Sequence, residues 1–314
     1  MTVGLRALLE AVIDYAGLFP PAKLPLQEAV REYLELRESP EAWMLGRFVI
    51  PAGRVAELEA WEEELFRVDR PLELSLLGRS GATATAWMSQ FHADLNTVRD
   101  FLLSHSDGVA VPSWELPLPV ETDAETILGM IDANWERDTD SVETDIFLEV
   151  PGARADDGRR GLIGLIAARR NERPRLGFKL RTGGQTADAF PSVEKLADIV
   201  LTCHEHKCPW KATAGLHHPL RHYDPKIDVT MHGFLNVLFA AVLAETHDLS
   251  DSALQEIVAD EDAANFQVND DGIRWRDYSA TIEQIETTRR TTFQSFGSCS
   301  FDEPRDDLRR LGLL

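Results

Sequence analysis

Two segments of the sequence each place a lysine shortly before a hydroxyl residue and glycine, near what we predict to be the end of a hydrophobic strand. They are GFKLRTGG at 177–184 and PWKATAGLHH at 209–218, and their lysines are Lys179 and Lys211. Of the 32 basic residues only six are lysines and 26 are arginines, so a lysine in an apolar segment is conspicuous. A lysine amine that has lost its proton can attack a carbonyl group and form a Schiff base. The two segments therefore predict covalent catalysis by lysine.

The two lysines would influence each other's protonation. They are 32 positions apart in the sequence, which is one strand–helix–strand step, and neighbouring strands lie about 4.8 Å apart. Like charges at that range and burial in a dry interior both disfavour the ammonium form, so we expect the pKa of Lys179 to be lowered. The alternative is that one lysine merely pairs with a core carboxylate such as Glu149.

The residues that follow the two lysines are suited to binding an anion and to moving a proton. Turns that contain hydroxyl residues and glycine can surround an anion with backbone N–H groups. The guanidinium group of Arg181 could bind a carboxylate or phosphate, with a structural salt bridge as the alternative. Either His217 or His218 is a candidate acid or base, because adjacent residues point to opposite faces of a strand. The candidate anion-binding residues are Arg181, Thr182, Gly183, Gly184, Thr213 and Gly215.

Short apolar segments alternate with amphipathic segments, such as 54–68, along the whole chain. Apolar strands without polar alternation are typical of a parallel sheet that is buried on both faces, and the alternation predicts an α/β fold. Seven such units are visible, and an eighth strand at 291–300 would close a (β/α)8 TIM barrel. A strand-like segment at 266–278 is the alternative eighth strand. We predict one domain, 1–314, with a long helical excursion at about 217–290 between strands seven and eight.

Composition restricts the partners and the location. The 53 acidic and 32 basic residues give a formal charge of −21, whereas a nucleic-acid-binding protein needs clustered cations. The sequence has no signal-peptide pattern, no apolar run long enough for a membrane span and no even set of cysteines for disulfides. The cluster CHEHKC at 203–208 departs from the usual zinc spacing. We therefore expect a cytoplasmic protein with a small-molecule substrate, no nucleic-acid or membrane partner, and no metal or other cofactor.

Several short segments, in order along the chain, resemble those of deoxyribose-phosphate aldolase, a (β/α)8 family that works through a lysine Schiff base. FKLRTGG and WKATAGLHH resemble its two lysine motifs, which implies that Lys179 forms the Schiff base and that Lys211 perturbs it. VIDYAGLFPPA and IFLEVPGA resemble its first and fifth strands, which implies catalytic roles for Asp14 and Glu149. The resemblance implies a carbon–carbon lyase that acts on a small aldehyde or a phosphorylated sugar-like substrate. The segment SFGSCSF resembles the family's phosphate-binding turn, which implies phosphate binding by Gly297, Ser298 and Ser300.

The chain also departs from this family. The family carries a catalytic aspartate on its fourth strand, whereas GVAVPSWELP at 108–117 offers only Glu115 nearby, and the family lacks the long excursion. Two alternatives therefore stay open. In one, the protein is a non-catalytic barrel whose apolar helix at 231–245 forms the subunit interface of a homo-oligomer. The other is a metal-assisted hydrolase or lyase with ligands among His217, His218, His222 and Asp224.

Overall fold

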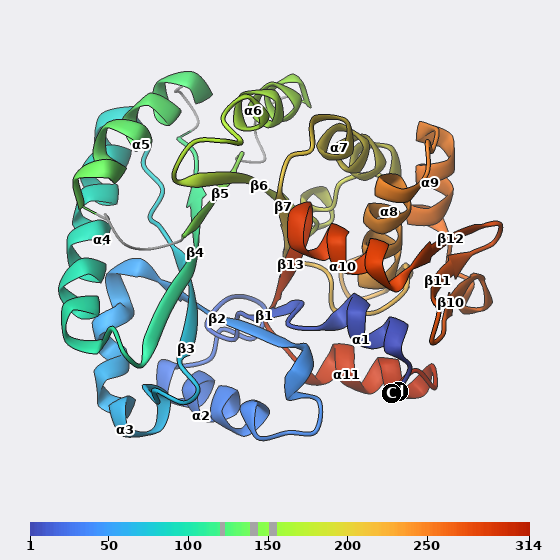
Figure 1. Cartoon of the computed structure of the whole chain (residues 1–314), viewed down its shortest axis with the longest axis horizontal. Coiled ribbons are helices and arrows are strands. Elements are labelled where there is room, and N and C mark those ends of the chain that lie inside the picture. Colours follow the sequence, from blue (N-terminus) through green and yellow to red (C-terminus); the bar gives the residue numbers. More distant parts are fainter. Residues whose placement is uncertain (120–122, 139–143, 151–155) are drawn as a thin grey trace.

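A computed structural model of the chain describes residues 1–119, 123–138, 144–150 and 156–314. Within these residues, eight parallel strands form a closed barrel in the order β1-β13-β7-β6-β5-β4-β3-β2 (Figure 1). Consecutive barrel strands pair with each other, the last strand β13 closes the barrel against β1, and the predicted (β/α)8 TIM barrel is confirmed. The barrel strands are β1 (Ile13–Tyr15), β2 (Leu45–Pro51), β3 (Leu72–Leu77), β4 (Val109–Pro117), β5 (Asp145–Glu149), β6 (Arg175–Arg181), β7 (Trp210–Thr213) and β13 (Phe293–Ser298).

Helices alternate with these strands and surround the barrel (Figure 1). Their apolar residues join those of the outward faces of the strands in one hydrophobic core. The α-helices are α1 (Val3–Leu9), α2 (Leu26–Arg37), α3 (Glu62–Leu65), α4 (Ala84–His105), α5 (Ala124–Asp138), α6 (Asp156–Ala168), α7 (Val193–His206), α8 (Phe234–Thr246), α9 (Asp251–Ala259), α10 (Ile282–Thr291) and α11 (Asp302–Arg310). In the part of the chain that the structure describes, none of the helices combines the length and the apolar character needed to cross a membrane.

The segment after β2 is not the α-helix that its amphipathic pattern predicts. Most of it is a 3₁₀ helix, η2 (Ala52–Trp61), and only the short α3 is α-helical. The buried residues of η2 are Ala52, Val55 and Leu58, which recur every third position. A 3₁₀ helix has three residues per turn, so it places these three side chains on one face, toward the core.

The eighth strand of the barrel is β13, as predicted from 291–300, and the alternative at 266–278 is wrong. That segment belongs to a separate antiparallel sheet of β10 (Phe266–Val268), β11 (Gly272–Trp275) and β12 (Tyr278–Thr281). The reason is local: Asn269 accepts hydrogen bonds from the backbone of Asp271 and Gly272 through its side chain, which turns the chain back between β10 and β11. The rest of the excursion contains α8, α9, α10, the 3₁₀ helix η4 (Ala263–Asn265) and a hairpin of β8 (His222–Asp224) and β9 (Val229–Met231).

The apolar helix α8 is part of the core of the chain itself. All residues from Phe234 to Ala244 are buried, and the helix packs against α7, α9 and α10. A helix that is apolar on all sides is expected to be buried on all sides. The hypothesis that this helix forms a subunit interface is therefore wrong, because its side chains are already covered within one chain.

Candidate functional site

The two lysines lie side by side in the barrel wall. Glu149 on β5, Lys179 on β6 and Lys211 on β7 occupy matching positions in the register of the three strands. The side chains of Lys179 and Lys211 are 3% and 0% exposed, respectively. Because equivalent positions in parallel strands point to the same face, the three side chains share the barrel interior.

One carboxylate bridges the two lysines. Oε2 of Glu115, on β4, lies 2.7 Å from Nζ of Lys179, and Oε1 lies 2.6 Å from Nζ of Lys211. Each lysine has a second carboxylate: Glu149 for Lys179, at 2.8 Å, and Asp14 on β1 for Lys211, at 2.6 Å. We call these five residues, Asp14, Glu115, Glu149, Lys179 and Lys211, the lysine–carboxylate network.

Short polar side chains on other strands hold the carboxylates of the network in place. Ser295 on β13 donates to Oδ2 of Asp14 over 2.6 Å, and Ser75 on β3 donates to Oε1 of Glu115 over 2.7 Å. The backbone N–H of Arg47 on β2 donates to Oδ1 of Asp14 over 3.0 Å. The network is therefore tied to strands around the whole barrel, which fixes the positions of its charges.

The pKa of Lys179 is shifted in the direction opposite to the one expected from the sequence. Burial alone disfavours the ammonium form, as expected, but the carboxylates of Glu115 and Glu149 outweigh burial and raise the pKa of Lys179 above its usual value. The expectation of a lowered pKa is wrong because it considered Lys211 and burial but not the two carboxylates. Lys179 is consequently an ammonium ion at rest.

The carboxylates show the complementary shift. Burial opposes ionisation of Glu115, but the ammonium groups of Lys179 and Lys211 outweigh it and hold the pKa of Glu115 far below its usual value. The pKa of Asp14 is lowered against burial mainly by Lys211, and that of Glu149 mainly by Lys179. All three carboxylates are ionised at neutral pH and can accept a proton only when a neighbouring cation is neutralised.

Lys179 borders a cavity whose described lining includes neither Lys211 nor the two carboxylates, Glu115 and Glu149, that contact its Nζ. The cavity has a volume of about 1010 Å³ and is bounded by β6, the loop after it, and helices α6 and α7. Arg181 also lines it, is 48% exposed, and donates from Nε to Oε1 of Glu149 over 2.7 Å. The cavity therefore lies beside Lys179 and contains a partly exposed cation, Arg181.

The loops after β6 and β7 pack directly against each other. Gly215 has φ +79°, and a Cβ atom there would lie 2.9 Å from the Cα atom of Gly183. The hydroxyl of Thr182 donates to the backbone oxygen atoms of Thr213, over 3.2 Å, and Ala214, over 2.5 Å. The hydroxyl of Thr182 is thus occupied in joining the loops. Gly184 is also in a tight place, because a Cβ atom there would lie 2.6 Å from the Cβ atom of Ala189.

The predicted phosphate-binding turn lies at the end of β13. Gly297 pairs in register with Asp14 and Thr213, next to the network. The hydroxyl of Ser298 donates to the backbone oxygen of Ser300 over 2.6 Å. The hydroxyl of Ser300 accepts from the backbone N–H of Glu303, in the first turn of α11, over 3.3 Å. Both serine hydroxyls therefore shape the turn before α11.

The two predicted catalytic histidines contact α11 rather than the lysines. Nδ1 of His217 lies 3.1 Å from Glu303, and His218 contacts Asp307. Burial lowers the pKa of His218, so it is neutral at physiological pH. Across the described residues, no three His, Cys, Asp or Glu side chains come together in a way that could hold a metal ion. The set proposed for the metal-assisted alternative, His217, His218, His222 and Asp224, is therefore not a ligand cluster.

Sequence reasoning did not select several residues that complete the network. Glu115 was noticed only as a departure from a family pattern, although it makes contact with both lysines. An available signal was the alternation on β4, which places Ser113 and Glu115 on the same face of an otherwise apolar strand. Ser75, Ser295 and Arg47 carried no comparable signal, because single polar residues in strands are common.

Comparison of the chain with protein-family models, with curated proteins and with solved structures finds no match. The assignment of a function therefore depends on the chemistry of the network and of the cavity beside it.

Proposed function

We propose that the protein is a carbon–carbon lyase of the class I aldolase type, distantly related to deoxyribose-phosphate aldolase, in which Lys179 forms a Schiff base with the substrate. The observation that carries the proposal is the position of Lys179, whose Nζ lies between two carboxylates and which lines a cavity of about 1010 Å³. Cavities of this size accept small ligands. The substrate is a small aldehyde or a phosphorylated sugar-like compound.

The first chemical step is loss of a proton from Lys179. When a carbonyl substrate enters and excludes water, Glu115 or Glu149 accepts this proton, because both lie within 2.8 Å of Nζ. The free amine attacks the carbonyl carbon, and water leaves as the carbinolamine becomes an imine. The protonated imine then takes up the electron pair of the breaking carbon–carbon bond while the β-hydroxyl gives its proton to a carboxylate. Protonation of the enamine and hydrolysis of the imine release the second product and restore Lys179.

Lys211 and Arg181 have supporting roles in this proposal. Lys211 neutralises one oxygen of Glu115 and so weakens the hold of that carboxylate on Lys179. Arg181 pairs with Glu149 and has half of its side chain exposed, so it can bind an anionic group of the substrate. Arg181 would also keep Glu149 charged and in place when Lys179 turns toward the substrate.

Borohydride trapping tests the proposal. The protein is incubated with a panel of small aldehydes, ketones and sugar phosphates, reduced with borohydride, and digested for mass spectrometry. We expect a reduced adduct on Lys179, none in Lys179→Ala, and an unchanged adduct in the control Lys226→Ala, which removes an exposed lysine of the excursion. Lys211→Ala should form the adduct at higher pH than the unsubstituted protein. An adduct that persists in Lys179→Ala, or no adduct across the panel, contradicts the proposal.

A second candidate, a barrel without catalytic activity, is favoured by one observation. Both lysines are matched by carboxylates within 2.8 Å, and Lys211 is 0% exposed, which is also what a purely structural network requires. In that case Lys179→Met, which keeps the length of the side chain without the amine, would leave every measurable reaction unchanged. The trapping experiment separates the two candidates, because a structural lysine gives no adduct with any carbonyl compound.

A further inference from the structure

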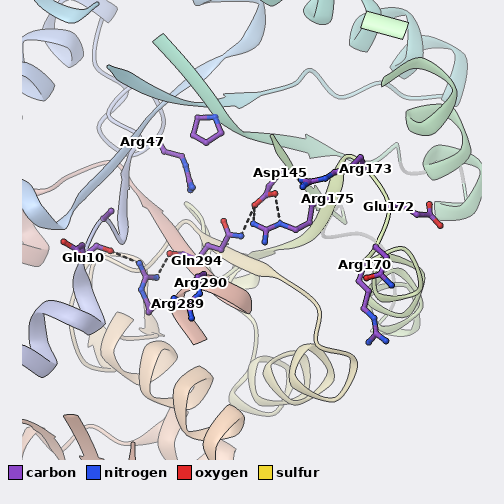
Figure 2. Close-up of a pocket in the computed structure, with 13 residues that line it drawn as sticks. Glu10, Arg47, Asp145, Arg170, Glu172, Arg173, Arg175, Arg289, Arg290 and Gln294 are labelled. Atoms are coloured by element: carbon purple, nitrogen blue, oxygen red, sulfur yellow. Dashed lines mark hydrogen bonds and ion pairs between the residues drawn. The ribbon is translucent and has the colours of Figure 1, made fainter. Parts of the chain in front are cut away.

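Six arginines line a second cavity at the opposite end of the barrel. The cavity has a volume of about 670 Å³ and lies at the amino ends of the strands, where Asp145 begins β5 and Arg175 begins β6 (Figure 2). The described chain carries its catalytic candidates at the carboxyl ends, so this cavity is separate from the proposed active site. The six arginines are Arg47, Arg170, Arg173, Arg175, Arg289 and Arg290.

The charge of this cavity contrasts with that of the whole chain. Its lining contains the six arginines and three carboxylates, Glu10, Asp145 and Glu172, and thus has a net charge of +3. The chain as a whole has a formal net charge of −21. A concave surface whose charge is opposite in sign to that of the rest of the molecule concentrates small counter-ions, which are anions in this case.

The three carboxylates of the cavity already have arginine partners. Glu10 lies 2.7 Å from Arg6, and Glu172 lies 4.0 Å from Arg169, and neither of these arginines lines the cavity. Asp145 accepts from Nε of Arg175 over 2.7 Å. Arg47 also has a carboxylate nearby, because its Nη1 lies 3.8 Å from Oδ2 of Asp14. Within the described residues, Arg289 and Arg290 have no such carboxylate.

Arg289 shows this lack of compensation most clearly. Its guanidinium group donates to backbone oxygen atoms, those of Glu10 over 2.9 Å, Phe293 over 3.3 Å and Gln294, as Figure 2 shows in part. In the described chain, no carboxylate lies within ion-pair distance of Arg289 or of its neighbour Arg290. Burial lowers the pKa of Arg289 to about 10, which is the effect of removing a cation from water without an equal counter-charge.

Two buried donors at the cavity also have no acceptor. Within the described residues, the Nε–H groups of Arg47 and Arg289 are inaccessible to solvent and make no hydrogen bond. The two arginines come from different elements, β2 and α10, and both line the cavity (Figure 2). A buried donor without an acceptor calls for an explanation, and a bound ion or water molecule is one such explanation.

We propose that this cavity is a binding site for a small organic phosphate, with Arg47, Arg289 and Arg290 as its principal ligands. Guanidinium groups bind phosphate oxygens, in a bidentate manner where two N–H groups point the same way, and a net charge of +3 matches a compound with two phosphate groups. Arg289, whose guanidinium already donates to three backbone oxygens, can add a single N–H. The volume of about 670 Å³ admits such a molecule. The acidic surface around the cavity disfavours long polyanions such as nucleic acids, which would have to contact that surface as well.

Calorimetric titration of the full chain with pyrophosphate, in a phosphate-free buffer of low ionic strength, tests the proposal. We expect one site, with affinity at least tenfold lower in Arg290→Gln and in Arg289→Gln. Arg290 is exposed and has no ion pair in the described chain, so its substitution leaves folding intact. Arg31→Gln is the matched control, because Arg31 is exposed on α2 and its substitution changes the net charge equally. Lys179→Ala should bind pyrophosphate with unchanged affinity, since Lys179 lies at the other end of the barrel.

Three results would overturn the proposal. The first is the absence of binding of pyrophosphate at millimolar concentrations. The second is an equal loss of affinity in Arg31→Gln and Arg290→Gln, which would attribute binding to net charge alone. The third is binding of citrate, a carboxylate of similar charge, as tight as that of pyrophosphate, which would contradict the phosphate assignment.

Discussion

Replacement of Glu115 by glutamine is the most direct test of the lysine–carboxylate network. The shape of the side chain is kept, but one negative charge between two ammonium groups is lost. The amide oxygen can accept from only one of Lys179 and Lys211, and the amide N–H₂ group then faces the other ammonium group, donor against donor. Removal of one partner from a buried ion pair costs about 3–5 kcal/mol. Because each lysine keeps a second carboxylate, we expect the lower end of this range, near 3 kcal/mol.

This loss should be visible in thermal unfolding. For a chain of 314 residues, with an unfolding entropy of about 2.1 cal/mol/K per residue, about 3 kcal/mol corresponds to a decrease in melting temperature of roughly 5 °C. Circular dichroism measures the decrease, and Glu73→Gln serves as the control, because Glu73 is an exposed glutamate on the neighbouring strand β3. Surface substitutions of this kind change stability by about 0.5 kcal/mol or less.

The same substitution should change the protonation of Lys179. Its pKa is raised because Glu115 and Glu149 together outweigh burial. With Glu115 neutral, burial counts for more and the pKa of Lys179 falls, so more free amine is present at neutral pH. If Lys179 forms an imine, the pH at half-maximal borohydride trapping should decrease in Glu115→Gln. An unchanged melting temperature together with an unchanged trapping profile would refute the role assigned to Glu115.

Three other perturbations have defined outcomes. Acidification should lower the melting temperature from about pH 4 downward, because the carboxylates of the network have lowered pKa values in the folded chain. Their contribution to stability is fully present above the pKa of the unfolded chain, and it is lost as the pH falls through the pKa of the folded chain. A melting temperature that is constant between pH 5 and 2 would contradict this. Gly215→Ala should lower the free energy of unfolding by roughly 1–3 kcal/mol in chemical denaturation, because φ is +79° and the new Cβ atom would lie 2.9 Å from the Cα atom of Gly183. The loss should be smaller in Gly129→Ala, where a Cβ atom would have no neighbour within 4 Å. Leu235→Asp should unfold the chain rather than dissociate an oligomer, because Leu235 is 1% exposed; a folded variant of reduced mass in light scattering would contradict the burial of α8.

The order of elements was largely predictable from the sequence. Apolar segments without polar alternation mark strands of a parallel barrel, and the interval of 32 positions between Lys179 and Lys211 places them on neighbouring strands. In the structure the two lysines are direct partners in register. The eighth strand was also predictable, because Phe293–Ser298 is followed by a helix-like segment, as the other barrel strands are, whereas 266–278 contains a turn signal.

The protonation of the site could not be predicted in the same way. Glu115 lies on β4, two strands from Lys179 and three from Lys211, so its contacts with them run across the barrel interior and leave no trace in sequence spacing. The sign of the pKa shift of Lys179 depends on these contacts, and so the prediction from neighbouring strands was wrong. The histidines after β7 were likewise assigned from proximity in the sequence, whereas the partners of His217 and His218 come from α11, more than 80 positions later.

The structure gives the two lysines unequal freedom even though they occupy equivalent positions. Lys211 is held by Glu115 and by Asp14, and Asp14 is itself fixed by Ser295 and by the backbone of Arg47. Moving Lys211 would leave the buried carboxylate of Asp14 with Arg47 as its only cation within ion-pair distance in the described chain, and Nη1 of Arg47 lies 3.8 Å away, farther than the ammonium group of Lys211 at 2.6 Å.

Lys179 can move at a smaller cost. One of its partners, Glu149, has a second cation in Arg181, and the other, Glu115, has a second cation in Lys211. Each carboxylate therefore keeps a counter-charge when Lys179 is neutralised by proton transfer or drawn into the cavity that it lines. In a dry interior this sharing lowers the energy of the state in which the amine is free, since no carboxylate is left alone. The same sequence motif on two strands thus gives two lysines with different surroundings: the carboxylates of Lys179 have second cations at 2.7 and 2.6 Å, whereas the second cation of Asp14, beside Lys211, lies at 3.8 Å.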